Sequence, residues 1–293
     1  MKFRDIIDLT LLAAIWGASF LFMRVAAPEF GAIPLIFTRI LIAVLFLLPI
    51  VIYRKKQLIV TENIADFALL GLLNSAMPFT LLAYATLYLT AGFTSIINAT
   101  TPIFATIIAV IWGRYQLTRM TTFGLIVGVS GVVMLVWGKV SFDLSDSSGA
   151  IIAGLLAAAC YGMTANFAKQ RLSHIHPLSL SFGSLLASTL LLMPLAIYFW
   201  PNQTPSLLSW INVIVLGIVC TGLAQIMYFR LLRRIGPTNS TTVTFLIPIF
   251  GVIWGAIFLA EILTLETLLA SSVILLGTGF STGILSFPRP LKK

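Results

Sequence analysis

Polar side chains recur at helical spacing within long apolar stretches of this chain. In one stretch Asn74, Tyr84 and Tyr88 fall near a common helical face, and in another Gln225 and Tyr228 do so. Phenol and amide groups on one face of a helix can hydrogen-bond a small polar solute. They can equally hold neighbouring helices together. The chemistry that these stripes predict is therefore binding rather than bond making.

Aromatic residues in the middle of other apolar stretches extend this set. Trp16 precedes Ser19, and Tyr161 precedes Thr164, by three residues each. A mid-span ring is no interfacial anchor, because the aromatic belt of membrane proteins lies at the headgroups. Such rings belong to the core or to the wall of a cavity, where they suit ligands with an apolar body and a polar or cationic part. The expected substrate-binding residues are Trp16, Ser19, Asn74, Tyr84, Tyr88, Asn98, Tyr161, Thr164, Thr221, Gln225 and Tyr228.

One cation and one carboxylate are candidates for a gate or a charge pair. Arg39 lies about two turns into an apolar stretch, and we expect its side chain to snorkel to the nearer membrane interface. The alternatives are an ion pair with Glu29 or Glu261, or attraction of an anionic group on a substrate. Glu261 falls at the end of a stretch, where solvation is easy or where it starts a turn.

Two prolines inside apolar stretches are candidate hinges. Pro102 and Pro248 each remove a backbone donor and should kink a helix. A kink frees a carbonyl that a hydroxyl or a ligand can use. Kinking is the simpler interpretation at both positions, and paired kinks at equivalent depth would let the protein flex.

The composition places these residues in a membrane. Hydrophobic residues make up 59% of the chain and charged residues 9%, and the mean hydropathy is +1.05. Soluble domains carry about 25% charged residues, so a soluble class is excluded. The net charge of +9 does not indicate nucleic acid, because the basic residues gather in short loops. Two cysteines, Cys160 and Cys220, are expected to be buried thiols, and no metal or cofactor is expected.

We predict ten membrane-spanning helices. The expected ranges are 7–25, 33–53, 67–88, 92–113, 120–138, 148–168, 178–199, 207–230, 236–260 and 266–286. With the N-terminus inside, 15 of the 18 basic residues fall in cytoplasmic segments. This asymmetry follows the positive-inside rule and puts both termini in the cytoplasm.

The chain also repeats itself at half its length. Pro-Ile-Phe at 102–104 returns at 248–250, and Leu-Thr at 117–118 returns at 263–264, each 146 residues later. Five spans per copy make the copies antiparallel across the membrane. We therefore expect an all-α polytopic membrane protein of two inverted five-helix repeats, residues 1–140 and 147–288, with a substrate site between them.

These features together resemble one family. The ten spans, the duplicated Pro-Ile-Phe, the segment Ala-Glu-Ile-Leu-Thr at 260–264 and Arg39 early in the second span are similar to EamA-type members of the drug/metabolite transporter superfamily. The likeness covers essentially the whole chain. It departs where Arg114-Tyr115 stands at the position matching Ala260-Glu261, so the glutamate is not duplicated. The resemblance implies export or exchange of small metabolites, with spans 1–4 and 6–9 lining the path and spans 5 and 10 packing.

The sequence thus favours a secondary transporter that moves amino acids or similar zwitterions across the cytoplasmic membrane by alternating access. A nucleotide-sugar or organic-anion carrier is the alternative, and it would predict several cationic cavity residues. A channel would need a wide polar lining, and a membrane enzyme a cluster of nucleophile, base or metal ligands; neither pattern is present. The expected partners are a small solute and the lipid bilayer. The Gly-x-x-x-Gly spacings at 124–128 and 279–283 permit a homodimer through spans 5 and 10.

Overall fold

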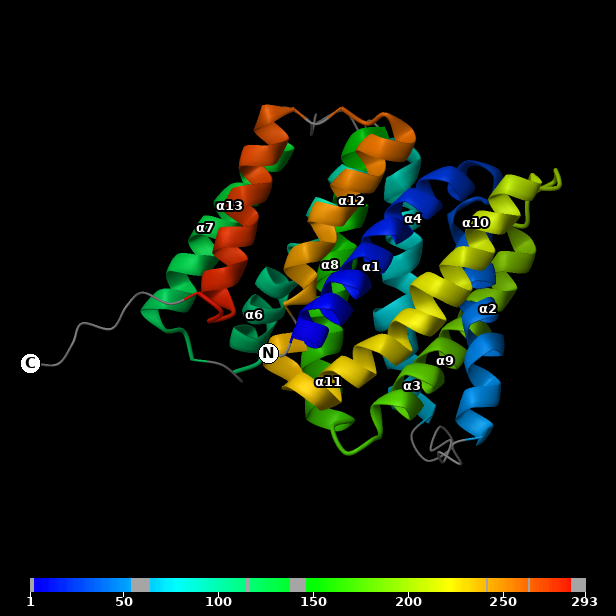
Figure 1. The fold of residues 1–293 in the computed structure, drawn as a ribbon, viewed down its shortest axis with the longest axis horizontal. Helices are drawn as coiled ribbons and strands as arrows, with labels where there is room; N and C mark the ends of the chain where they lie inside the picture. The colour runs from blue at the N-terminus through cyan, green and yellow to red at the C-terminus, as the bar shows by residue number, and fades with distance from the viewer. Residues whose placement is uncertain are drawn as a thin grey trace, which may run out of the picture.

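The computed structural model is built of helices joined by short turns (Figure 1). It describes residues 3–53, 64–113, 116–137, 146–240, 242–262 and 264–285, with the backbone alone at 237–239. No strand occurs in these residues. Part of the predicted basic loops, at 54–63, 114–115 and 286–293, and Leu263 of the repeated Leu-Thr lie outside the described residues.

Eight helical stretches are long and apolar enough to cross a membrane, and two shorter apolar helices accompany them. The longer stretches are α1 (Phe3–Phe30), α2 (Ala32–Tyr53), Ile64–Tyr88, Ala91–Ile111, α7 (Arg119–Val136), α8 (Asp146–Arg171), α9 (Pro177–Tyr198) and Leu207–Gly236. The shorter helices are α12 (Val243–Leu259) and α13 (Leu265–Ser281). Each of the ten lies on one predicted span, so the chain is a multi-pass membrane protein.

Three stretches are composite. The third consists of α3 (Ile64–Gly71), a π-helical turn at Leu72–Ala76 and α4 (Met77–Tyr88). The fourth consists of α5 (Ala91–Asn98) and α6 (Thr101–Ile111). The eighth consists of α10 (Leu207–Gly217), a π-helical turn at Ile218–Leu223 and α11 (Ala224–Ser240). The two π-helical turns fall 146 residues apart, like the sequence repeats.

The predicted start of the ninth span, at 236, differs from the observed helix start. Gly236 has a φ of 79° inside α11, a left-handed conformation that glycine adopts without strain. The chain therefore turns at Gly236, and the regular helix α12 begins at Val243.

The two candidate hinge prolines differ in surroundings. The helix breaks between α5 and α6, and Pro102 is the second residue of α6. At this position its missing N–H leaves no hydrogen bond unmade. Pro248 lies inside the continuous helix α12.

Hydroxyl side chains fix several helix starts. The Oγ1 atoms of Thr118 and Thr264 accept hydrogen bonds from the backbone N–H groups of Thr121 and Thr267, at 3.1 and 3.3 Å. These N-caps satisfy donors that a helix cannot pair internally. They explain why the repeated Leu-Thr comes immediately before α7 and α13.

The helices α7 and α13 lie side by side at one edge of the bundle (Figure 1). Their contact is made by glycines, since a Cβ at Gly131 would lie 2.8 Å from the backbone N of Ile274, and one at Gly124 would lie 2.7 Å from the carbonyl carbon of Phe280. A close approach of backbones is what small residues permit. These glycine faces are covered within the chain, so a homodimer through the same helices would have to use their outer faces.

The remaining helices of the two halves interleave through reciprocal contacts. A Cβ at Gly17 on α1 would lie 2.7 Å from Cβ of Phe250 on α12, and a Cβ at Gly162 on α8 would lie 2.7 Å from the N of Ala105 on α6. Gly17 and Gly162 are 145 residues apart, and their partners have the same separation. Equivalent helices of the two halves thus pack in equivalent ways.

A second pair of glycine contacts is also related by the repeat. A Cβ at Gly71 would lie 2.8 Å from the carbonyl oxygen of Ser184 on α9, and one at Gly217 would lie 2.9 Å from the carbonyl oxygen of Arg39 on α2. Arg39 and Ser184 are again 145 residues apart. The largest cluster of buried apolar residues lies among α1, α2, α4, α9 and α10.

Polar contacts join the halves at both ends of the bundle. The helices α1 and α12 both end at the upper end in Figure 1. Just before the end of α1, Glu29 accepts hydrogen bonds from Ser206, and just after α12, Glu261 accepts them from the backbone of residues 91 and 92. At the lower end, Arg234 pairs with Asp5 and Asp8. The lower end is also where α1 begins and α13 ends.

Candidate functional site

A cavity of about 380 Å³ lies inside the bundle. This volume is within the range of about 300–1,000 Å³ that small-molecule sites occupy. Both halves of the chain contribute to its wall. The lining residues are Trp16, Ser19, Phe20, Met23, Arg39, Asn74, Phe79, Leu82, Ser95, Asn98, Ala99, Thr101, Tyr161, Pro177, Leu180, Ser181, Ser184, Cys220, Thr221, Gln225, Tyr228, Phe229, Val243, Thr244, Ile247 and Pro248.

Most of the residues expected from the sequence to bind substrate come together here. Those on the cavity wall are Trp16, Ser19, Asn74, Asn98, Tyr161, Thr221, Gln225 and Tyr228, with Arg39 and Pro248 from the gate and charge-pair set. The others lie elsewhere: Tyr84, Tyr88, Thr164, Pro102 and Glu261.

Tyr84 and Tyr88 pack on each other rather than on the central cavity. Their ring centroids are 5.3 Å apart, and a Cβ at Gly149, at the start of α8, would lie 3.5 Å from the Tyr84 hydroxyl. Thr164 is buried within α8, where its Oγ1 donates to the carbonyl oxygen of Cys160 at 2.9 Å. Phe79 and Leu82 of α4 line the cavity, and Tyr84 follows Leu82 by two residues, which puts Tyr84 on the opposite side of the helix. The π-helical turn at Leu72–Ala76 adds to the difference, because it changes the rotation of the helix between Asn74 and the two tyrosines.

Aromatic rings form two walls of the cavity. Trp16 on α1 and Tyr228 on α11 lie 5.5 Å apart between centroids, and Phe79 on α4 contacts Tyr161 on α8 at 6.3 Å with the rings on edge. Each pair joins the first half of the chain to the second. Paired rings of this kind give a flat apolar surface with hydroxyl and indole groups at its margin.

Arg39 is buried at the cavity wall, with 3% of its surface exposed. Its Nε donates to Thr221 Oγ1 at 2.9 Å, and its Nη1 lies 3.5 Å from the Met23 sulfur. Its Cζ lies 4.1 Å above the centre of the Phe79 ring. The expectation that Arg39 snorkels to the interface is therefore wrong, because the ring and the hydroxyl hold the guanidinium inside.

The alternative, an ion pair of Arg39 with Glu29 or Glu261, is also absent from the described residues. Glu29 Oε2 accepts from Ser206 N at 2.6 Å, and its Oε1 accepts from Ser206 Oγ at 2.9 Å. Glu261 Oε1 accepts from Ala91 N at 2.7 Å, and its Oε2 accepts from Gly92 N at 3.0 Å. Each carboxylate thus lies at the N-terminus of a helix of the other half, where a negative charge is stabilised.

The amides of the cavity differ in how they are satisfied. Asn74 Nδ2 donates to Ser75 Oγ at 3.2 Å, whereas Asn98 Oδ1 is buried and has no hydrogen-bond partner among the described residues. Ser181 and Ser184 of α9 line the cavity and were not singled out in the sequence. The signal that could have found them is the three-residue spacing of hydroxyls, in a helix whose counterpart carries Arg39.

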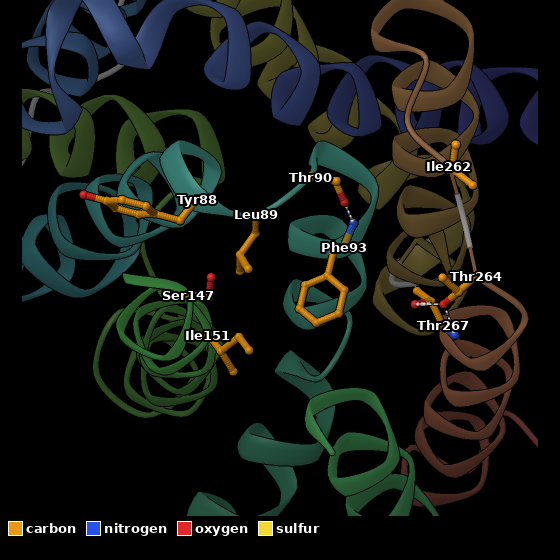
Figure 2. A pocket seen from close by; sticks show the side chains of 9 residues that line it. All are labelled: Tyr88, Leu89, Thr90, Phe93, Ser147, Ile151, Ile262, Thr264 and Thr267. Carbon is orange, nitrogen blue, oxygen red and sulfur yellow. Dashed lines mark hydrogen bonds between the residues drawn. The ribbon is translucent and has the colours of Figure 1, made fainter. Parts of the chain in front are cut away.

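A second pocket of about 350 Å³ lies at the upper end, between the end of α4, the first turn of α5, the start of α8 and the start of α13. Figure 2 shows Phe93 between Leu89 on one side and the Thr264–Thr267 pair on the other. Tyr88 lines this pocket. Its polar groups are mainly hydroxyls that already bond within the chain, since Thr90 Oγ1 accepts from Phe93 N and the Thr264 and Thr267 hydroxyls bond each other.

The central cavity is suited to binding. Both described cysteines, Cys160 and Cys220, are free and buried, and the described residues contain no group of three His, Cys, Asp or Glu side chains that could hold a metal ion. The wall offers a cation, phenols, amides and hydroxyls around an apolar volume. This set can hold a solute by hydrogen bonds and ring contacts.

Known proteins resemble this chain over most of its length. An uncharacterized transporter of Archaeoglobus fulgidus is 26% identical over 92% of this chain and 96% of its own. The uncharacterized transporter YoaV of Bacillus subtilis is 26% identical over 94% and 95%. The uncharacterized inner membrane transporter YedA of Escherichia coli is 24% identical over 94% and 90%. One crystal structure shares the fold, with a TM-score of 0.66 at 15% identity over 97% of this chain and 99% of that one.

The family described as EamA-like transporters matches the chain twice, over residues 6–137 and 148–283. These matches cover both groups of helices that form the cavity wall. The protein is a multi-pass membrane transporter, and it belongs to the EamA-like transporter family.

Proposed function

We propose that this protein is a secondary transporter that carries amino acids or similar zwitterions across the cytoplasmic membrane by alternating access, in export or exchange. The observation that carries the proposal is the central cavity, whose wall is shared by residues 1–140 and 147–288. A solute held between two halves can be exposed to either side when the halves move relative to each other.

Reciprocal packing supports an inverted pair of repeats. Gly17 with α12 matches Gly162 with α6, and Gly71 with α9 matches Gly217 with α2. Such matched contacts are expected when each half is related to the other by a pseudo-two-fold axis in the membrane plane. On this proposal each half can adopt the conformation of the other, which exchanges the open side of the cavity.

The extent of the cavity supports one access state. Polar contacts join the halves at both ends, through Glu29 and Glu261 at the upper end and through Arg234 at the lower end. Pro177 and Val243, the first residues of α9 and α12, line the cavity, so the cavity extends toward the lower end. With both termini in the cytoplasm, as the basic loops favour, this conformation is directed inward.

The wall favours a small zwitterion over the alternative substrates. Rings and amides suit an amino acid with an apolar side chain, whereas a nucleotide sugar or a larger organic anion calls for several cations. Among the cavity residues in the described part of the chain, Arg39 is the single charged one. A nucleotide-sugar carrier is thus the weaker candidate. We further propose the lipid bilayer and the solute as the partners of the chain, and a homodimer would use the exposed faces of α7 and α13.

Counterflow in proteoliposomes tests the proposal. Purified protein would be assayed with a panel of amino acids, sugars and organic cations. We expect amino acids to exchange faster in vesicles that contain the protein than in vesicles without it. Gln225→Ala should raise KM by about 2- to 10-fold, the effect of losing one hydrogen bond. Gln203→Ala, in the exposed turn before α10, is the matched control and should leave KM unchanged. Absence of exchange for every solute in the panel would overturn the proposal.

A further inference from the structure

The central cavity holds a cation whose counter-ion is not supplied by the described residues. Arg39 is 3% exposed, and no described carboxylate lies within ion-pair distance of it. Both carboxylates that could have reached it, Glu29 and Glu261, bind backbone N–H groups instead. An ionised side chain inside a membrane protein is unfavourable and marks a functional site when it faces a cavity.

The neighbours of Arg39 fix its orientation without neutralising it. The Phe79 ring covers one face of the guanidinium, at 4.1 Å from Cζ, and the Thr221 hydroxyl accepts from Nε. That hydroxyl donates in turn to the carbonyl oxygen of Leu216 at 2.8 Å, five residues earlier. Because Thr221 lies in the π-helical turn at Ile218–Leu223, these bonds link the position of Arg39 to this turn.

The outer edge of the guanidinium is left for a ligand. A guanidinium carries five N–H donors. In the described structure Nε bonds Thr221, Nη1 has only the weak acceptor Met23 Sδ, and Nη2 has no protein acceptor. Two terminal nitrogens in one plane match the two oxygens of a carboxylate.

We propose that Arg39 is the binding site for the carboxylate of the transported solute, so that the substrates are monocarboxylates, among them zwitterionic amino acids. This proposal rests on the carrier function proposed above and names the group by which the solute is recognised. A carboxylate brings one negative charge to one buried cation, whereas a phosphate ester would bring about two. The carboxylate lies against Arg39, and the rest of the solute occupies the cavity that Tyr161, Gln225 and Tyr228 also line.

Charge balance gives this arrangement a consequence for transport. With a carboxylate bound, the guanidinium has a counter-ion, and the loaded protein can change conformation without moving a bare guanidinium through a low-dielectric region. The empty protein has to rearrange around a bare cation. Loaded exchange is therefore faster than return of the empty carrier.

The test compares each acid with its primary amide. Proteoliposomes containing wild type, Arg39→Gln or Arg39→Lys are assayed for counterflow of L-leucine and L-phenylalanine against L-leucinamide and L-phenylalaninamide, which lack the carboxylate. We expect wild type to prefer the acids, and Arg39→Gln to reduce the acid-to-amide ratio at least about 10-fold, as expected for loss of a buried charge pair. Arg39→Lys should fall between them, because an ammonium keeps the charge without the planar fork. The exposed Arg233→Gln on α11 is the charge-matched control and should retain the wild-type ratio.

Three results separate the possible failures. An unchanged acid-to-amide ratio in Arg39→Gln, with exchange intact, overturns the carboxylate site while the carrier function stands. Equal exchange of acids and amides by wild type also overturns the carboxylate site while the carrier function stands. If wild type exchanges neither acids nor amides, the amino-acid carrier itself is wrong, and the carboxylate site is overturned with it. Retained transport of the amides by Arg39→Gln shows that the variant is folded, and a size-exclusion profile in detergent provides the independent check.

Discussion

The Glu29 carboxylate accepts two hydrogen bonds from Ser206, one from the backbone N–H at 2.6 Å and one from the hydroxyl at 2.9 Å. This contact joins the end of α1 to the start of α10, and therefore the first half of the chain to the second. Glu261 makes the reverse connection, from the end of α12 to the start of α5. Two carboxylates thus join the halves at the upper end of the bundle.

Neutralising Glu261 should open that end more often. A glutamine can offer one oxygen in place of two and turns an N–H group toward a helix N-terminus, so Glu261→Gln loses about 0.3–1 kcal/mol of stabilisation of the closed end. The assay uses a cysteine at position 82 in a background without the native cysteines, and an impermeant maleimide added on the side of the membrane where Glu261 lies. We expect this cysteine to react about 2- to 5-fold faster in Glu261→Gln than in the protein that retains Glu261. Adding Glu29→Gln should increase the rate further. Glu266→Gln, on the exposed first turn of α13, is the control, and equal rates in all variants would show that these contacts do not close the upper end.

Alanine at the interleaving glycines should destabilise the protein. A Cβ at Gly17 or Gly162 would lie 2.7 Å from an atom of a neighbouring helix, and overpacking of this kind typically costs about 1–3 kcal/mol. We expect lower unfolding temperatures in detergent for Gly17→Ala and Gly162→Ala, by similar amounts because the contacts are equivalent. Gly149→Ala is the matched control in α8, since the added Cβ would lie 3.5 Å from the Tyr84 hydroxyl, an ordinary contact distance. A loss as large at Gly149 would mean that packing is not the cause.

Thr221 should act on substrate through Arg39. Thr221→Val keeps the shape of the side chain but removes the acceptor of the Arg39 Nε and the donor to Leu216. Hydrogen bonds to charged groups contribute about 1.5–3 kcal/mol, so we expect KM for carboxylate substrates to rise about 10-fold or more. kcat should change less, and Thr221→Ser should restore KM because the hydroxyl is retained. An equal rise in KM for primary amides would indicate general damage to the cavity instead.

The tyrosines Tyr84 and Tyr228 lie in corresponding helices of the two halves, α4 and α11, but should behave differently. Tyr228 lines the cavity and packs on Trp16, whereas Tyr84 packs on Tyr88 and the start of α8. We expect Tyr228→Ala to raise KM and Tyr84→Ala to lower the unfolding temperature with KM little changed. Concentration-dependent counterflow and thermal unfolding of the same preparations measure both quantities. A raised KM in Tyr84→Ala alone would reverse the assignment.

The inverted arrangement predicts the sidedness of two exposed residues. Tyr53 ends α2 and is 88% exposed, and Trp137 follows α7 and is 80% exposed. Cysteines placed at these positions should be labelled from opposite sides of the membrane, Tyr53 from the cytoplasm. Labelling of both from one side in intact cells would break the topology.

The eight long apolar helices and the two shorter ones could be predicted because the bilayer dictates the length of an apolar helix. The repeated markers at a constant offset were equally readable, and Gly17, Gly71, Gly162 and Gly217 now have packing roles that their spacing alone did not specify. What the sequence could not provide is the rotation of each helix after an irregular turn. The extra residue in the π-helical turn at Leu72–Ala76 changes the helical rotation between Asn74 and the two tyrosines, Tyr84 and Tyr88. The apolar pattern of the sequence does not predict this turn.

Arg39 shows a second limit of sequence reasoning. Its depth along the helix was correctly placed, but a side chain near the interface can turn outward or inward, and the choice depends on residues far away in the chain. Here Phe79 of the first half and Thr221 of the second half contact the guanidinium and hold it inward. Glu261 illustrates the same point, since its acceptor role depends on N–H groups 170 and 169 residues earlier.

The interleaving of the halves has a consequence for synthesis of the protein. When the first five helices have entered the bilayer, Thr221 and the rest of α10 and α11 have not yet been made, so the nascent chain has to keep Arg39 solvated or against lipid headgroups. The newly inserted first half is consequently an unfinished intermediate, open to quality-control proteases until translation delivers its second set of helices.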